Sequence, residues 1–158
     1  MPNTHGASGA SLPSEFPDSV AELFEAHGWP RLAGRVLAEL MLAEPPFLST
    51  VQLCDRLGTS KGHLSSAITV LKVMGMIERF GVAGSRRHHY RLTPDAFVRA
   101  MHAAAQPSRT FAELADQALG DVPAGSRAHD ELTRMRDFYR FLAQRFPQLV
   151  AEFEAQSR

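Results

Sequence analysis

The chain has 158 residues, of which 44% are hydrophobic and 22% are charged, and its formal net charge is zero. This length is enough for one domain with a sizeable core, or for a small domain with an added interaction element. The neutral total argues against a protein that binds nucleic acid over its whole surface. A single cysteine excludes an internal disulfide framework and suits the reducing cytoplasm. No run of about eighteen apolar residues occurs, so no membrane span is expected.

The N-terminal third is expected to contain a tail and two helices. Residues 1–17 have few apolar residues and lack the basic start and apolar run of a secretory signal, so we expect a disordered tail. Residues 18–47 should form helices that support dimerisation. The first is predicted over Asp18–His27 with Asp18 as its cap, and the second over Pro30–Ala43, where Glu44-Pro45-Pro46 ends it.

Residues 48–94 have the pattern of a helix-turn-helix. Apolar residues at helical spacing predict a short helix over Thr50–Leu57, and Gly58 suits a left-handed turn before Thr59 or Ser60 caps the next helix. That helix is predicted from Lys61 to Met74, where Gly75 ends it. One of its faces is apolar, and the other carries hydroxyls and amines but no carboxylate. Nothing on this polar face repels phosphate, so its N-terminal half can lie in a major groove.

A wing is predicted after the second helix. Met76–Phe80 and His88–Leu92 have the composition of strands, and the glycine-bearing loop between them ends in Arg86 and Arg87, which can reach a phosphate or a narrow minor groove. Alternation along the second strand places His89 on the polar side and Tyr90 on the core side. The residues expected to contact DNA are Ser60, Lys61, His63, Ser65, Ser66, Thr69, Lys72, Arg86, Arg87 and His89.

Net positive charge is concentrated in the same segment. Residues 48–94 contain seven Lys or Arg residues but only Asp55 and Glu78, so this segment carries +5 and the remainder of the chain −5. A cationic module within a neutral chain favours DNA contact by that module.

Residues 95–158 are expected to form a helical dimerisation region. A helix is predicted over Asp95–Ala105, Pro107 is expected to break or kink it, and a second helix is predicted over Arg109–Leu119. The last helix carries a heptad seam, and Pro147 predicts a kink or a fresh helix start. The seam favours an intertwined dimer, because a helix-turn-helix binds DNA as a two-fold pair; packing onto its own subunit is the alternative. The seam residues are Leu132, Met135, Tyr139, Leu142, Phe146, Leu149 and Phe153.

Three segments resemble the winged helix-turn-helix regulators of the MarR type: Leu53–Ser60, Leu71–Arg79 and Arg86–Pro94. Arg31–Arg35 and Val82–Arg87 are more similar to the branch with the glycine-betaine-type regulators and the mycobacterial repressor of lipid-exporting membrane pumps. The resemblance covers most of the chain from about residue 22 to residue 153. Many members of the family carry an aspartate two residues before the wing arginine, where this chain has Ser85.

The resemblance implies a mainly α fold, with a winged helix-turn-helix domain, a two-stranded wing, and N- and C-terminal dimerisation helices. It also implies a homodimeric DNA-binding regulator that acts as a repressor on a pseudo-palindromic operator. A small apolar effector, lipid-like or aromatic, would bind between the dimerisation helices and the DNA module and release the DNA. The aromatic residues that could contribute to such a pocket also suit an ordinary core, which is the interpretation we favour; they are Phe97, Phe111, Phe138 and Phe141.

Other functions have weaker support in the sequence. Cys54 could sense oxidants, but its place in the helix-turn-helix favours a buried small side chain. His88 and His89 point to opposite faces of a strand, so neither a metal site nor a cofactor is predicted. Gly81–Gly84 does not open a helix, and no catalytic motif is present, so an enzyme is not expected. The remaining alternatives are a winged-helix protein-interaction module and a thiol- or metal-responsive regulator.

Overall fold

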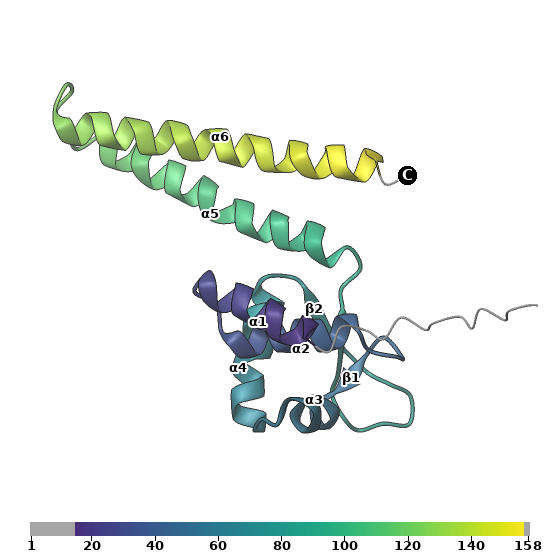
Figure 1. The fold of residues 1–158 in the computed structure, drawn as a ribbon. Coiled ribbons are helices and arrows are strands. Elements are labelled where there is room, and N and C mark those ends of the chain that lie inside the picture. The colour runs from purple at the N-terminus through teal and green to yellow at the C-terminus, as the bar shows by residue number, and fades with distance from the viewer. Residues whose placement is uncertain (1–14, 157–158) are drawn as a thin grey trace, which may run out of the picture. The chain divides into compact units, whose positions relative to one another are not determined.

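A computed structural model of the chain describes residues 15–156. The chain divides into two compact units, of which the first contains the chain up to Leu71 together with Arg79–Leu92. The second unit contains Lys72–Glu78 and the chain from Thr93 onward (Figure 1). Most of the predicted tail, residues 1–14, lies outside the described residues, and the tail does not extend to residue 17 because a helix has already begun at Phe16. No helix within residues 15–156 is long and apolar enough to cross a membrane.

The first unit begins with α1 (Phe16–Ala26) and α2 (Arg31–Met41), which pack against each other. The prediction that Asp18 caps α1 was wrong, because the helix starts at Phe16 with a proline in its first turn and has no side-chain cap. Asp18 lies in that first turn, with a carboxylate oxygen 3.5 Å from Nε of Arg35 on α2. A carboxylate near a helix N-terminus is favourable even without capping geometry.

Gly34 allows α1 and α2 to approach closely. A Cβ atom built at this position would lie 2.8 Å from both Cα of Ala21 and the carbonyl oxygen of Val20 on α1. Both contacts are with backbone atoms, which cannot move aside as a flexible side chain can. Gly34 and Ala21 are buried, so the two backbones form the packing surface of this helix pair.

The helix-turn-helix predicted from the sequence is confirmed as α3 (Thr50–Leu57) and α4 (Lys61–Val73). Ser49 caps α3: its hydroxyl accepts a hydrogen bond from the amide of Gln52 at 3.2 Å, and the Gln52 side chain accepts one from the amide of Ser49 at 2.8 Å. Gly58 then adopts the left-handed conformation with φ of 59°. This reciprocal cap and turn fix where α3 starts and where the chain turns into α4.

The sheet has three strands, one more than the predicted wing. They are β1 (Leu48–Ser49), β2 (Ile77–Phe80) and β3 (His89–Leu92), in the order β1-β3-β2. β1 runs antiparallel to β3, with Leu48 opposite Tyr90 and Ser49 opposite His89. The central strand of the sheet is therefore β3, and β1 connects it directly to the start of α3.

The second unit contains the long helices α5 (Ala96–Leu119) and α6 (Arg127–Gln156), which lie side by side (Figure 1). The predicted break at Pro107 was wrong, since α5 continues through it, and α6 likewise continues through Pro147 without a fresh start. The middle and C-terminal half of α5 bury small side chains at steps of three and four residues, which lets α6 approach. These residues are Ala105, Ser108, Ala112 and Ala115.

The heptad seam of α6 is only partly covered within the chain. Its first five residues are half-buried, and the ring of Tyr139 stacks on that of Phe111 with centroids 4.7 Å apart. Leu149 and Phe153, which complete the seam, are 49% and 58% exposed. Part of the seam therefore packs on its own subunit, as the alternative expectation held, and the rest is uncovered in this chain.

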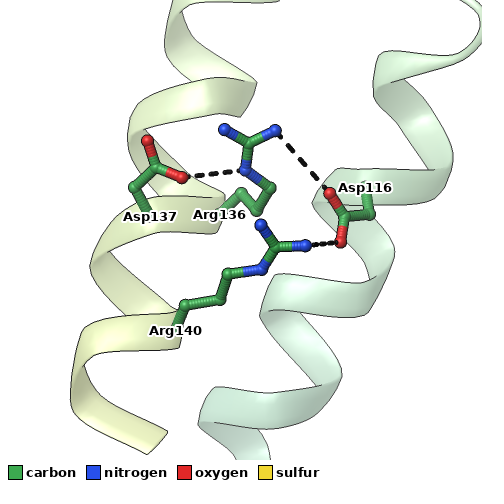
Figure 2. Close-up of polar contacts among 4 residues, drawn as sticks. All are labelled: Asp116, Arg136, Asp137 and Arg140. Atoms are coloured by element: carbon green, nitrogen blue, oxygen red, sulfur yellow. Dashed lines mark hydrogen bonds and ion pairs between the residues drawn. The ribbon is translucent and has the colours of Figure 1, made fainter. Parts of the chain in front are cut away.

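A cluster of four charged residues includes the ion pairs that join α5 to α6 (Figure 2). Asp116 on α5 accepts a hydrogen bond from Arg140 on α6 and lies 3.8 Å from Nη1 of Arg136. Nε of Arg136 donates to Asp137 at 2.8 Å. This hydrogen bond lowers the pKa of Asp137 and raises the pKa of Arg136, because it favours the charged form of both groups.

Candidate nucleic-acid interface

The polar face of α4 is on the surface, where the sequence analysis placed it. The hydroxyl of Ser60 accepts a hydrogen bond from the amide of His63 at 3.3 Å, which confirms Ser60 as the residue that caps α4. The opposite face is buried and holds the helix through Leu64, Ala67, Ile68 and Leu71. The exposed predicted contact residues are Ser60, Lys61, His63, Ser65, Ser66, Thr69 and Lys72.

This exposed face presents hydrogen-bonding groups and positive charge without a carboxylate. Thr69 donates its hydroxyl hydrogen to the carbonyl of Ser65 at 2.9 Å, so toward solvent it offers a methyl group and oxygen lone pairs. A methyl group suits contact with thymine, and hydroxyls can pair with any base edge. The face is therefore chemically suited to the floor of a major groove.

The wing arginines lie on an ordered turn. The amide of Ser85 donates to the carbonyl of Val82 at 3.0 Å, and Gly84 has the positive φ of 78° that the turn requires. The hydroxyl of Ser85 accepts a hydrogen bond from the amide of Arg87 at 3.2 Å. Ser85 thus fixes the backbone of Arg87. Both wing arginines have exposed side chains.

The structure brings the wing and the start of α4 to one cationic notch, which we call the wing notch. The amide of Thr50 donates to the carbonyl of His88 at 3.0 Å, which ties the start of α3 to the end of the wing loop. Sequence analysis missed the part that Thr50 and Val51 play here, since their pattern indicated only helix. The notch has a volume of about 230 Å³ and is lined by Thr50, Val51, Lys61, Arg86, Arg87 and His88.

His89 does not fit the DNA contact expected of it. Its side chain is 7% exposed and lies against the rings of Phe47 and Phe80, with centroids 5.7 Å and 6.1 Å away. Its Nδ1 is buried without a hydrogen-bond partner among the described residues. Strand alternation suggested a polar face here, but Phe47 covers that face and turns it into a small aromatic core. The guanidinium of Arg91 lies over Phe80, 4.6 Å from the ring centroid.

The four aromatic residues considered for an effector pocket are not part of the core. Phe97, Phe138 and Phe141 are 58%, 56% and 58% exposed, and Phe111 is 40% exposed, so the expectation of ordinary core residues was wrong. They also do not line one common cavity. Phe97 contributes to an apolar cavity of about 220 Å³ within the second unit, and Phe111 to a different one. The residues around the first are Phe97, Val98, Met101, Leu149, Val150 and Phe153.

Cys54 is half-buried on α3. Within residues 15–156, no group of three or more His, Cys, Asp or Glu side chains could hold a metal ion.

These features define a winged helix-turn-helix DNA-binding protein: a short helix, a left-handed glycine turn, a second helix with a cationic exposed face, and an arginine-tipped hairpin. Comparison with protein families agrees: the MarR family model matches residues 27–88, and a model described as "MmpR5-like MarR family transcriptional regulator" matches residues 95–156. The chain belongs to the MarR family of transcriptional regulators.

Two individual proteins show how far the likeness extends. The chain is 34% identical over 131 residues to the HTH-type transcriptional regulator MmpR5 of Mycobacterium tuberculosis, and the match covers 81% of this chain and 78% of the relative. A crystal structure described as that of a transcriptional regulator matches with a TM-score of 0.81 and 31% identity. That match covers 89% of this chain and 97% of the other.

Proposed function

We propose that this protein is a repressor that binds a pseudo-palindromic operator as a homodimer and leaves it when a small apolar effector binds. The observation that carries the proposal is the exposed face of α4, which has seven predicted contact residues and no carboxylate. In this proposal Ser60–Lys72 enters the major groove, and Arg86 and Arg87 contact the backbone or the minor groove. Two copies would read half-sites roughly 34 Å apart, one turn of DNA.

Exposed apolar side chains in the second unit support a dimer. Phe138 and Phe141 of α6 have more than half of their surface in solvent, and so do Phe97 and Leu114 of α5. Burial of apolar surface contributes about 25 cal/mol of favourable free energy per Å². Covering these side chains with a second copy of the chain would therefore stabilise a dimer. The helices α5 and α6 are therefore the proposed dimerisation elements.

The apolar cavity beside Phe97 supports a small apolar effector, because its lining includes Met101 and Leu149 and no charged side chain of the described chain. Such a molecule would displace the repressor only by binding the DNA-free form more tightly than the DNA-bound form.

An electrophoretic shift assay tests the proposal. The full chain is titrated into duplex fragments from upstream of its own gene at rising salt, with a coding fragment of equal length as the control. We expect a saturable complex that outlasts the control complex as salt increases. A winged helix that serves only as a protein-interaction scaffold would shift neither fragment, even at low salt. Peroxide and chelator arms test the thiol- and metal-responsive alternatives, which require the complex to dissociate under one of these additions.

A further inference from the structure

A second cationic notch borders α4, and sequence analysis did not find it. It lies where the start of α2, the turn between α3 and α4, and the side of α4 meet, and its volume is about 540 Å³. Arg31 and Arg35 supply its positive charge. Thr59, His63 and Ser66 supply hydrogen-bonding groups, and no carboxylate occurs among the described residues that line it. We call it the α2 notch.

The arginines of the α2 notch have N–H donors that are available to a ligand. Arg31 contacts Glu25 at 3.1 Å and Glu22 at 3.8 Å, but its side chain is 43% exposed and these two carboxylates are more exposed still. Nε of Arg35 is 3.5 Å from Asp18, in ion-pair range, yet it is buried and makes no hydrogen bond to the described residues. A guanidinium has five N–H donors, and exposed ion pairs contribute only about 0–1 kcal/mol, so an incoming oxyanion can compete for both groups.

The two notches lie along opposite flanks of α4. Successive residues of a helix are about 100° apart, so Lys61 and His63 point to directions about 160° apart around the axis. Lys61 lines the wing notch, whereas His63 and Ser66 line the α2 notch. A helix with its side chains is about 10–12 Å across and the major groove is about 12 Å wide. A helix inserted in that groove therefore has the phosphates of one strand along each flank.

We propose that Arg31 and Arg35 bind DNA backbone phosphates, on the flank of α4 that the wing does not cover. The inference rests on the proposed DNA binding and deepens it. Each half-site is held at both strands: the wing notch takes the phosphates of one, and the α2 notch takes those of the other. These contacts set the depth and the angle at which α4 lies in the major groove, and they carry no base preference.

The test is the salt dependence of binding by the full chain. Fluorescence anisotropy of a labelled mixed-sequence duplex of about 20 base pairs is measured between about 50 and 200 mM salt. Arg31→Gln and Arg35→Gln should each reduce the slope of log K against log salt by about 1.8, because each of the two copies loses one phosphate contact worth about 0.9, and the double variant by about twice that. The matched control is Arg134→Gln, which removes the same charge from an exposed α6 side chain paired with Glu131 at 3.9 Å.

The outcomes separate the two proposals. If Arg31→Gln and Arg35→Gln have the same salt slope as Arg134→Gln, the phosphate site is wrong but the proposed DNA binding stands. If the unaltered chain does not bind DNA even at low salt, the proposed function itself is wrong. Thermal melting shows whether each variant is folded. If loss of the Asp18 contact unfolds Arg35→Gln, Arg31→Gln alone decides the question, because its side chain is exposed. Loss of affinity confined to one operator sequence would also contradict a backbone contact.

Discussion

Arg86 carries its charge on an exposed turn that borders Lys61, so its guanidinium can follow a phosphate without displacing other protein groups. We predict that Arg86→Ala weakens binding to operator and to random duplex by similar factors and lowers the salt slope by about 1.8, which is about 0.9 for each copy of the dimer. Ser65→Ala is the comparison, because a hydroxyl on the exposed face of α4 should alter preference among operators instead. Both are measured by anisotropy over a salt series, and an unchanged slope for Arg86→Ala would remove the wing from the interface.

Gly34 is the residue on which the packing of α1 against α2 depends. We predict that Gly34→Ala lowers the free energy of unfolding by about 1–3 kcal/mol, because the new methyl group meets backbone atoms of α1 at 2.8 Å. The matched control is Gly62→Ala on the exposed side of α4, where the nearest atom would be 3.9 Å away. That change should be neutral or stabilise by about 0.5–1 kcal/mol. Chemical denaturation of both variants checks the difference, and equal stabilities would show that the helices can separate at no cost.

Asp137 gives the α5–α6 pair a pH dependence. Its pKa lies below the ordinary value of about 3.9 for Asp because Arg136 donates a hydrogen bond to it. A lowered pKa in the folded state means that stability is present above the unfolded pKa and is lost as pH falls through the folded one. The melting temperature should therefore fall more between pH 5 and 3, roughly, than that of Asp137→Asn. The difference is small because Asp137 is 59% exposed and solvent screens its contact with Arg136. Parallel pH curves for the two proteins would refute it.

Local sequence patterns predicted the role of a single residue correctly only where that role depends on nearby residues in the chain. Ser60, Gly58 and the exposed face of α4 follow from capping, turn chemistry and helical spacing, which are properties of a few consecutive residues. His89 fails because its environment is made by Phe47, more than forty residues earlier in the sequence. The grouping of Arg31 and Arg35 with His63 was missed because only the fold brings α2 beside α4.

At the scale of elements, the turn between α3 and α4 and the start of α4 were predictable, but the start of α1 and the continuation of α5 through Pro107 were not. Pro107 lies within α5, and the helix continues because Ala105, Ser108, Ala112 and Ala115 on one side of it are buried. Packing of this kind can outweigh the roughly 3 kcal/mol that an interior proline costs. The two-residue strand β1 was missed for a related reason: it exists only as a partner of β3. The capping box of Ser49 and Gln52 marks where β1 ends and α3 begins.

The same argument predicts that Pro107 destabilises α5 locally. Pro107→Ala should raise the free energy of unfolding by roughly 1–3 kcal/mol, because it restores a backbone donor in the middle of a continuous helix. Both Pro107 and its neighbour Gln106 are exposed, so Gln106→Ala is the control and should change stability by less than about 0.5 kcal/mol. Denaturant titration compares the two. A destabilised Pro107→Ala would mean that the proline sets a bend on which the packing depends.

For the whole molecule, the sequence separates two kinds of surface. Net positive charge is concentrated in residues 48–94, whereas large exposed aromatic side chains are concentrated in α5 and α6. A cationic surface attracts DNA at long range, and an apolar surface associates only at contact. This division of roles is what a regulator needs if each copy binds half of an operator and the second copy fixes the spacing.

The exposed aromatic side chains of α6 provide the decisive test of assembly. We predict that Phe141→Asp converts the protein from dimer to monomer at micromolar concentration, because burying an unpaired carboxylate in an apolar interface is costly. Phe141 is 58% exposed, so its own subunit should keep its helical content. Gln144→Asp places the same charge one turn further along α6 and should remain dimeric if that exposed position lies outside the interface. Sedimentation velocity measures the mass of each species. A monomeric variant should also lose operator affinity, and its salt slope should fall toward that of a single half-site. If Phe141→Asp remains a dimer, the interface does not include Phe141.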